Sequence, residues 1–324
     1  MKTLSIFEPI REELELLEER LREAVGVEYS LLRHILDYLL DSGGKRVRPA
    51  LVILASKFHG SDVEKVLSLA ASVELLHTAT LVHDDLLDGS LLRRGNPTLN
   101  TSLSTEVVIL MGDYLFARAA DLAAATESVP IVSIFAQTLM TICSGELTQT
   151  LNSRGRWRWR TKEDYYRSIY SKTASLFAAS AEAGGILSGA PASTVEGLRA
   201  YGHHLGMAFQ ILDDILDFTG DEKELGKPIG SDLRQGTVTL PLLLFLETHP
   251  ESDILSSIFD EPRGSEEKIQ TLTEMVRNST AIASAHEEAE RFTAESKQAI
   301  QDLPANEYRQ VMLDLADHLS ERRE

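Results

Sequence analysis

Hydrophobic residues recur along most of this chain with the spacing of amphipathic helices. Residues 12–25 (EELELLEERLREAV) place four leucines among charged residues, which is the pattern of one such helix. The same periodicity predicts further helices at about 29–41, 49–58, 63–88, 103–126, 130–151, 162–187, 194–219, 237–248, 265–277, 280–301 and 305–322. Convincing runs of alternating β-branched residues are absent from the sequence, so it predicts an all-α fold.

Several central segments are apolar around most of their circumference, such as SLAASVELLHTATLV (68–82) and ASLFAASAEAGGIL (174–187). Helices of this kind lie inside a bundle, with other helices around them. Their many small residues leave little side-chain volume, so the space between them could close or stay open as a cavity. No Pro/Gly/Ser-rich linker divides the chain, and we therefore predict a single domain over 1–324.

Composition excludes some classes of protein. Apolar residues make up 43% and charged residues 25% of the chain, and the net charge of −18 argues against nucleic acid as a partner. The single cysteine, Cys143, is compatible with a reducing compartment, and the charged start of the chain does not resemble a signal peptide. No run of about 18 apolar residues predicts a spanning segment. We expect a cytoplasmic protein, which leaves room for a peripheral membrane contact during product release.

Residues 83–95 read HDDLLDGSLLRRG and collect three aspartates within one helical turn. Gly89 is placed to follow the end of the helix, where the negative pole of the helix dipole disfavours further negative charge. Either a cation compensates Asp84, Asp85 and Asp88, or the cluster is a solvated helix end. The double arginine that follows, Arg93–Arg94, is a candidate for that cation.

A second acidic cluster repeats this spacing in QILDDILD (210–217), at Asp213, Asp214 and Asp217. The members i and i+4 of each cluster lie about 40° apart on one helix face. Two matched clusters favour a shared function over two solvated helix ends. Oxygen ligands without His or Cys suit Mg²⁺, which proteins usually hold with a few carboxylates and the phosphates of a substrate. The sequence therefore predicts two facing carboxylate sets that clamp a diphosphate through Mg²⁺.

Basic residues occur where such an anion needs them. GGKRVRPAL (43–51) places Lys45, Arg46 and Arg48 ahead of Pro49, a favourable residue for the first turn of a helix. The start of a helix beside Lys and Arg is an anion site, although KRVR alone is more often a solvated patch. His77 lies seven residues before Asp84, about 20° away on the helix face, so it points with the acids.

Four segments together resemble the trans (head-to-tail) isoprenyl diphosphate synthases, the polyprenyl synthetase family. They are GGKRVRP, DDLLDGSLLRRG, YSKTASL and DDILDFTGDEKELGKPIGSDL, which occur in the family's order. The resemblance covers about residues 30–245 and loosely the rest. It implies an all-α homodimer in isoprenoid biosynthesis, with about ten or more helices around a deep central cavity. It also implies that the chain joins isopentenyl diphosphate to an allylic diphosphate with Mg²⁺.

The resemblance implies roles for individual residues. Asp84 and Asp88 would bind the Mg²⁺ that holds the allylic diphosphate, with Asp85 beside them and Asp213 as a further metal contact. Arg93 would touch the allylic diphosphate, and isopentenyl diphosphate would be held by Lys45, Arg48, His77 and Arg94. The reacting end of the allylic substrate would be lined by Lys172, Thr173, Gln210 and Lys227. The catalytic set would be Asp84, Asp85, Asp88, Lys172, Asp213, Asp214 and Lys227.

The chemistry agrees with these roles, because breaking an allylic C–O bond leaves a carbocation and an inorganic diphosphate. Metal and cationic side chains stabilise that leaving group, and an apolar pocket keeps water from the cation. In one respect the sequence departs from the family. Many members carry a second lysine where this chain has Thr237, which puts the strength of substrate binding in doubt.

Small residues at Ala79 and Thr80 predict a medium- to long-chain product. They are the fifth and fourth residues before Asp84, and short-chain members of the family commonly place a bulky aromatic residue there. Thr80 lies about 40° from Asp84 and should face the cavity. Three alternatives stay open: a farnesyl or geranylgeranyl diphosphate synthase, a terpene cyclase or head-to-head synthase, and a noncatalytic subunit that binds prenyl diphosphates. The segment GGKRVRP disfavours the cyclase, and the complete aspartate clusters disfavour the noncatalytic subunit.

Overall fold

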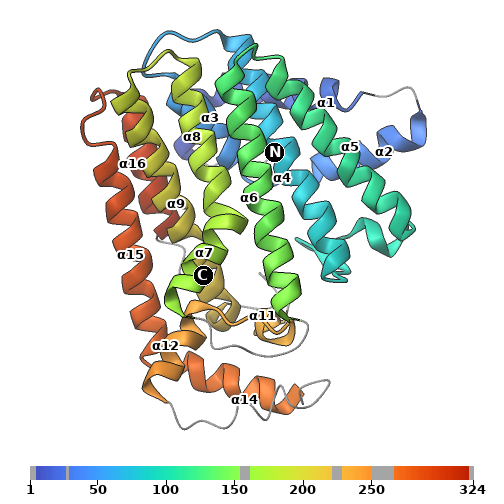
Figure 1. Ribbon diagram of the computed structural model, residues 1–324, viewed down its shortest axis with the longest axis vertical. Helices are drawn as coiled ribbons and strands as arrows, with labels where there is room; N and C mark the ends of the chain where they lie inside the picture. The colour runs from blue at the N-terminus through green and yellow to red at the C-terminus, as the bar shows by residue number, and fades with distance from the viewer. Residues whose placement is uncertain (1–4, 27–28, 154–160, 221–227, 250–265, 321–324) are drawn as a thin grey trace. The chain divides into compact units, whose positions relative to one another are not determined.

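The structure is a computed structural model that describes residues 5–26, 29–153, 161–220, 228–249 and 266–320, and these are almost entirely helical (Figure 1). This confirms the all-α prediction. The first elements are η1 (Ser5–Ile10), α1 (Arg11–Ala24), α2 (Ser30–Asp41), α3 (Val47–Ser56), α4 (Val63–Leu87), β1 (Leu92–Arg93), β2 (Asn96–Pro97), η2 (Leu99–Thr101), α5 (Thr105–Ala124) and α6 (Val129–Ser153). They are followed by α7 (Lys162–Ile169), η3 (Tyr170–Ala174), α8 (Ser175–Leu187), α9 (Ala192–Thr219), α11 (Ser231–Arg234), α12 (Leu240–Thr248), α14 (Glu266–Arg277), α15 (Ala281–Ala299) and α16 (Glu307–Ser320).

The residues form two compact units. One comprises Met1–Leu139, Leu176–Gly202 and Lys297–Leu315, and the other comprises Met140–Ser175, His203–Ser296 and Ala316–Glu324. The helices α6, α8, α9, α15 and α16 contribute residues to both. The first acidic motif belongs to the first unit and the second motif to the second unit. The single domain and its deep central cavity stay predictions.

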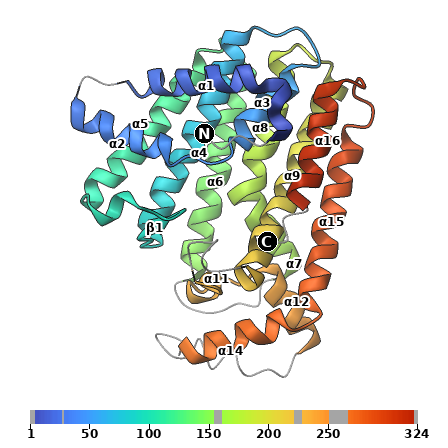
Figure 2. The same cartoon turned by 180° about the vertical axis from the view of Figure 1, so that it is seen from behind.

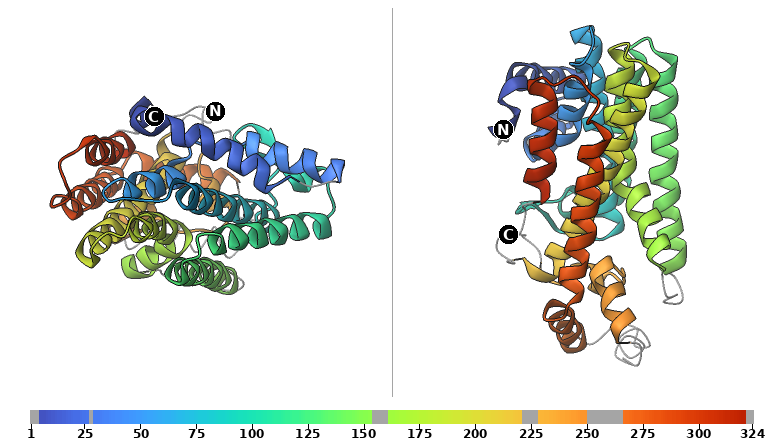
Figure 3. Two further views of the ribbon diagram at one scale, coloured as in Figure 1. Left: turned by 90° about the horizontal axis from the view of Figure 1, so that it is seen from above. Right: turned by 90° about the vertical axis from the view of Figure 1, so that its left-hand side faces the viewer.

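The first unit is organised around α4, which begins at Val63 and is preceded by the N-cap residue Asp62. The Asp62 carboxylate caps the helix by accepting a hydrogen bond from the backbone N–H of Glu64 at 3.0 Å. Views from two directions show α4 and α5 running side by side (Figures 1 and 3). Ser72 of α4 donates to the carbonyl of Ala119 on α5 at 2.6 Å, and His83 lies within hydrogen-bonding distance of the carbonyl of Ile109. These contacts fix which face of α4 is turned toward α5.

A short hairpin follows α4, which the sequence pattern did not predict. Its strands are two residues each, with Leu92 opposite Pro97 and Arg93 opposite Asn96. Arg94 and Gly95 form the turn with φ of 52° and 78°, and two successive positive φ values are the mark of a tight hairpin turn. The hairpin lies beside α2 (Figure 2), where Tyr38 donates to the carbonyl of Pro97. The double arginine is thus part of a constrained turn.

The second unit has a continuous apolar core. It is formed by buried residues of α7, α9, α12, α14 and α15, including Tyr165, Phe218, Phe245 and Phe292. Between α7 and α8 the chain forms a π-helix at η3, the YSKTA segment. A Cβ at Gly145 of α6 would lie 2.6 Å from the Cβ of Ser171, so α6 passes very close to this segment. Single π-turns inside helices occur frequently at functional sites.

Two helices among the described residues are long and apolar enough to cross a bilayer, by length and composition only. In α4 the most apolar window is 78% buried in the protein, which is typical of a core helix. In residues 129–151 of α6 only 17% of that window is buried. The outer face of α6 therefore exposes apolar side chains.

Candidate functional site

The first acidic motif contains its own compensating cation. Arg93 donates from Nε to both carboxylate oxygens of Asp85 at 2.9 Å, and its Nη2 lies 2.8 Å from Oδ1. Asp85 is buried at the end of α4, so its charge requires a partner. Asn100 and Ser90 complete the junction, since the Asn100 amide donates to the Ser90 carbonyl at 3.0 Å. The Asp85–Arg93 pair therefore ties the hairpin to the end of α4.

The other two aspartates of this motif are more accessible. Asp84 is half-buried and Asp88 is exposed, and the backbone N–H of Asp88 closes the last helical turn on the Asp84 carbonyl at 2.8 Å. Their carboxylates supply the hard oxygen ligands that suit Mg²⁺. Within the described ranges no three His, Cys, Asp or Glu side chains form a metal cluster. A site completed by substrate phosphates, which is usual for Mg²⁺, fits two carboxylates one turn apart.

Both arginines of the hairpin line a small cavity. The cavity has a volume of about 50 Å³, and its wall includes Ser42, Gly44 and His77 in addition to Arg93 and Arg94. Arg94 donates to the Ser42 carbonyl at 3.2 Å. A Cβ at Gly44 would lie 2.7 Å from the guanidinium of Arg94, so this arginine rests directly on the glycine. The wall thus contains two guanidinium groups, and it also contains Asp85 and Glu74, which pair with Arg93 and Arg46.

His77 is the neutral member of this cationic group. Arg48 on α3 donates from Nη1 to Nε2 of His77 at 3.1 Å, which requires that nitrogen to be unprotonated. Burial lowers the pKa of His77 well below its usual value, and the charges of Arg48, Arg94 and Arg93 lower it further. The Arg48 guanidinium also lies 4.8 Å from the centre of the Phe177 ring. The structure therefore brings together four of the predicted contacts: Arg48, His77, Arg93 and Arg94.

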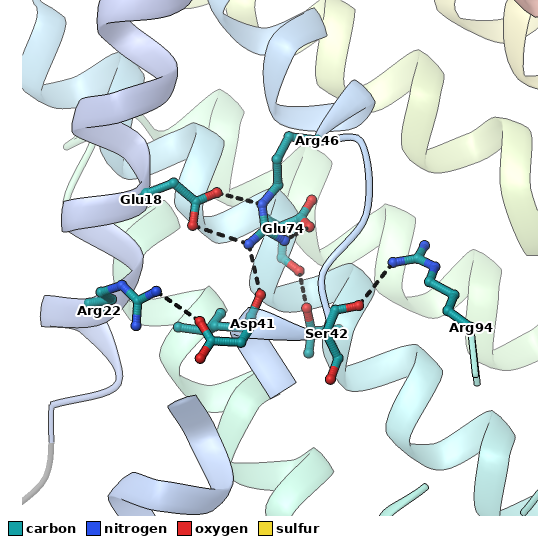
Figure 4. Close-up of polar contacts among 9 residues, drawn as sticks. Glu18, Arg22, Asp41, Ser42, Arg46, Glu74 and Arg94 are labelled. Carbon is teal, nitrogen blue, oxygen red and sulfur yellow. Dashed lines mark hydrogen bonds and ion pairs between the residues drawn. The ribbon is translucent and has the colours of Figure 1, made fainter. Parts of the chain in front are cut away.

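Arg46 occupies a different environment from its neighbours in the KRVR segment. Its guanidinium is buried between α1 and α4 (Figure 4), where Nη1 donates to Glu74 at 2.5 Å and Nε donates to Glu18 at 2.7 Å. Its Nη2 also donates to the carbonyl of Leu40 at 3.0 Å. Burial opposes the charge, but Glu74 and Glu18 outweigh it and raise the pKa of Arg46 above its usual value. The sequence grouped Arg46 with the basic residues of an anion site, but the structure pairs it with Glu18 and Glu74. The glutamate within the apolar segment 68–82, Glu74, was a signal that a cation must lie near it.

Lys45 is half-buried in the same segment. Its role as a contact for isopentenyl diphosphate stays a prediction.

The second acidic motif is less symmetrical than its sequence. Asp213 is exposed, whereas Asp214 and Asp217 are buried. Asp217 accepts a hydrogen bond from the backbone N–H of Asp232 at 3.0 Å, and its carbonyl accepts one from Gly230 at 2.8 Å. Asp217 therefore anchors the segment that follows α9, and Asp213 is the member of the motif that is open to solvent.

Asp214 forms a buried network. Tyr165 donates to one of its oxygens at 2.7 Å, and the Gln210 amide donates to the other at 2.8 Å. Burial raises the pKa of Asp214 well above its usual range, with further contributions from the charges of Asp232 and Asp213. Burial also raises the pKa of Tyr165, which keeps the phenol protonated as the donor. The catalytic role of Asp214 stays a prediction, and sequence reasoning missed Tyr165.

The π-helix η3 carries two of the predicted residues. Thr173 is buried and donates to Oε1 of Gln210 at 2.6 Å, which fixes the orientation of that amide. The ammonium of Lys172 lies 3.2 Å from the carboxylate of Glu146 on α6. Thr173 and Gln210 are thus joined to Asp214 in one hydrogen-bonded chain.

Two positions near the second motif remain to be placed. Lys227 lies outside the described residues, and its predicted role is untested. Thr237, where the sequence is expected to depart from the family, is half-buried, and its backbone N–H donates to the Asp232 carbonyl at 2.8 Å.

The two positions proposed to set product length differ in burial. Ala79 is fully buried and lies within about 40° of Ser72 and His83, the residues that contact α5. Thr80 is half-buried, and its hydroxyl donates to the His77 carbonyl at 2.7 Å. Ala79 therefore belongs to the helix face turned toward α5, and Thr80 lies nearer the face of His77 and Asp84.

Comparison with known proteins gives consistent matches along the chain. Residues 29–276 match the family model described as Polyprenyl synthetase. Heptaprenyl diphosphate synthase component 2 of Geobacillus stearothermophilus is 37% identical over 323 residues, which cover 99% of each chain. A polyprenyl synthase structure from Caulobacter crescentus CB15, complexed with calcium and isoprenyl diphosphate, has a TM-score of 0.92 and 33% identity, over 98% of this chain and 97% of that chain. A geranylgeranyl pyrophosphate synthase from Lactobacillus brevis has a TM-score of 0.90 and 32% identity over 98% of both chains.

Proposed function

Because this chain belongs to the polyprenyl synthetase family and is a prenyltransferase, we propose that it elongates an allylic diphosphate with isopentenyl diphosphate. The resemblance inferred from its four sequence motifs is confirmed by the family match. The observation that best supports the proposed substrates is the group of Arg48, Arg93, Arg94 and His77 beside the first aspartate motif. Such a group provides hydrogen-bond donors and positive charge for a diphosphate.

In the proposed reaction the allylic C–O bond breaks, and both bonding electrons leave with the diphosphate. The double bond of isopentenyl diphosphate attacks the allylic carbocation, and the loss of a proton gives a product longer by one isoprene unit. Arg93, already fixed by Asp85, binds the allylic diphosphate, and Arg48 and Arg94 bind isopentenyl diphosphate. Positive charge that is fixed in advance stabilises the charge that develops on the leaving group.

We propose Mg²⁺ as the metal, bound by Asp84, Asp88 and Asp213. When bound, it would supply the positive charge that neutralises the diphosphate leaving group. These three aspartates are the more accessible members of their motifs, whereas Asp85 and Asp214 are buried. This division supports a metal role for the first group and an orienting role for the second.

We assign the network of Thr173 and Gln210 to the reacting end of the allylic substrate. The Gln210 amide has one arrangement in this network, because its oxygen accepts from Thr173 and its nitrogen donates to Asp214. It therefore presents a fixed dipole. Lys172 contributes a positive charge that stays with the departing diphosphate, and the same role is proposed for Lys227.

We propose a medium- to long-chain polyprenyl diphosphate as the product. The heptaprenyl name of one relative supports this length, and the small side chains at Ala79 and Thr80 agree with it. A geranylgeranyl product is the second candidate, since a synthase of that name is also structurally similar. A noncatalytic subunit is disfavoured because both aspartate motifs are complete.

Purified protein incubated with farnesyl diphosphate, labelled isopentenyl diphosphate and Mg²⁺ tests the proposed activity. We expect incorporation of label into hydrophobic product, which chelation of the metal abolishes. A protein that binds isopentenyl diphosphate but never incorporates it would be a noncatalytic subunit.

We also propose that the chain forms a homodimer through α6. Met140, Leu147 and Leu151 expose 63%, 63% and 70% of their surface along one side of this helix. Stable interfaces bury about 800 Å² on each partner around such an apolar centre. We propose that a second copy of the chain covers this face. We also propose that the protein is cytoplasmic.

Sedimentation of wild type and Leu147→Glu tests the dimer. The charge should dissociate it, whereas Leu31→Glu, at an exposed leucine of α2, should leave it intact. A wild-type protein that sediments as a monomer would contradict self-association, and it would favour a different partner chain or a membrane surface for α6.

A further inference from the structure

We infer that Arg46 is a positioning residue for the isopentenyl diphosphate site. Its buried guanidinium fixes the segment 42–46 and the start of α3, so that Arg48 and Arg94 are held in place to bind the diphosphate. This inference rests on the proposed function of the site. Arg46 itself does not bind substrate.

The guanidinium of Arg46 contacts three different helices. It connects three helices, since Glu18 belongs to α1, Leu40 to α2 and Glu74 to α4 (Figure 4). Its side chain is only 3% exposed, and that of Glu74 is 6% exposed. A charge buried to this extent is held in one geometry by its partners, because movement would leave a charged group unpaired. Arg46 is therefore a rigid junction.

The two glycines before Lys45 each lie against an arginine side chain. A Cβ at Gly43 would overlap the guanidinium of Arg46, and a Cβ at Gly44 would crowd that of Arg94. Each glycine thus provides the space for one arginine. The carbonyl of Ser42, at the start of the same segment, accepts a hydrogen bond from Arg94. Segment 42–46, which Arg46 holds on one side, therefore forms the surface against which Arg94 packs.

Arg46 also determines how α3 begins. Arg46 precedes the helix with φ 53° and ψ 33°, a left-handed conformation that is unfavourable for any residue with a Cβ. Two residues later, Arg48 contacts His77, one helical turn beyond Glu74 on α4. The Arg46–Glu74 and Arg48–His77 contacts therefore join the same two helices at successive turns. The Arg46–Glu74 contact is buried and joins two charged groups, and it sets the geometry of the Arg48–His77 contact.

The charges around Arg46 favour a positioning role over direct binding of the diphosphate. Glu18 and Glu74 together carry two negative charges against the single positive charge of Arg46. An anion near Arg46 would meet a net negative environment. Removing one glutamate should therefore strengthen substrate binding if Arg46 is a ligand, and weaken it if Arg46 positions other residues.

The experiment compares Glu18→Ala and Gly43→Ala with wild type. Each should raise the KM for isopentenyl diphosphate about tenfold or more, while kcat and the KM for farnesyl diphosphate change little. Arg22→Gln is the control, because it removes an exposed ion pair that also joins α1 to α2 and leaves the pairs of Arg46 with Glu18 and Glu74 intact. This control should behave as wild type. Circular dichroism establishes that each variant is folded.

Calorimetric binding of isopentenyl diphosphate separates this inference from the proposed reaction. Tighter or unchanged binding by folded Glu18→Ala overturns the positioning role, whatever the turnover of the wild type. If the wild type binds isopentenyl diphosphate but does not elongate, the proposed function fails, and the binding of the variants still decides the role of Arg46. If the wild type binds none, both fail.

Discussion

Arg93 holds both carboxylate oxygens of Asp85 through Nε, at 2.9 Å each. This relationship explains how α4 can end in three aspartates. The middle aspartate is paired with a cation that comes from the hairpin immediately after the helix, and we propose the two more accessible aspartates as metal ligands. The same pair holds the hairpin that places Arg94 in the wall of the cavity.

We predict that Asp85→Asn weakens binding of the allylic substrate more than it weakens the fold. The amide keeps the shape of the carboxylate but loses its charge, so Arg93 becomes mobile. The free energy of unfolding should fall by only about 1 kcal/mol, because Arg93 is partly exposed. Steady-state kinetics should show a higher KM for the allylic diphosphate. Lys65→Gln, which breaks an exposed pair with Glu127 near the start of α4, is the control and should change neither quantity.

Substitution of an accessible aspartate should affect the stability of the protein less than substitution of a buried one. Asp84→Ala and Asp213→Ala should lower turnover by about 100-fold or more, because each removes a ligand for the leaving-group metal. Their melting temperatures should fall less than that of Asp214→Ala, because neither side chain is buried and both are proposed to bind metal. Asp214→Ala should instead lower the melting temperature, because it leaves the buried Tyr165 hydroxyl without its acceptor. Near-normal turnover in Asp84→Ala or Asp213→Ala would contradict the metal assignment of that cluster.

Acid should destabilise the protein through His77. The folded-state pKa of His77 lies below the unfolded value of about 6.5, so the unfolded chain binds the proton more readily. The stabilising contribution is therefore present above about pH 6.5 and is lost as the pH falls toward the folded-state pKa. The loss should approach about 1.4 kcal/mol per pH unit. Denaturant unfolding of wild type and His77→Gln between pH 7 and pH 5 measures this contribution. Equal pH dependence in the two proteins would show that His77 is not the group responsible.

Much of the fold could be predicted because helical periodicity is a local signal. The predicted segment 63–88, for example, is observed as Val63–Leu87. The hairpin was missed because strands of two residues cannot show alternation. The π-helix was also missed, since the close approach of Ser171 to Gly145 depends on tertiary packing.

The site was predictable to the extent that charge clusters mark it in the sequence. The acidic and basic motifs identified Asp84, Asp213, Arg48 and Arg94 as candidates. The partners of Tyr165 could not be found in this way, because Asp214 is 49 residues away in the sequence. The family resemblance already singled out Asp84, Asp88 and Asp213 as metal ligands. The burial of Asp85, Asp214 and Asp217 depends on tertiary packing and could be seen only in the structure.

Product length should respond to Thr80 more specifically than to Ala79. Thr80→Tyr places a ring on the face of α4 nearer His77 and Asp84, and it should shorten the product while the first condensation continues. Ala79→Tyr places the ring against α5, where overpacking costs about 1–3 kcal/mol of stability. Chromatography of products and thermal melting of both variants measure these effects. An unchanged product distribution in Thr80→Tyr would contradict the role of this face in chain length.

Mass spectrometry of the products of the wild-type protein tests the central claim most directly. With farnesyl diphosphate, excess isopentenyl diphosphate and Mg²⁺, we predict polyprenyl diphosphates longer than geranylgeranyl diphosphate. One inorganic diphosphate should be released for each isoprene unit added, and chelation of Mg²⁺ should stop both. Products that end at geranylgeranyl diphosphate would contradict the proposed chain length, and the absence of any elongated product would contradict the proposed activity.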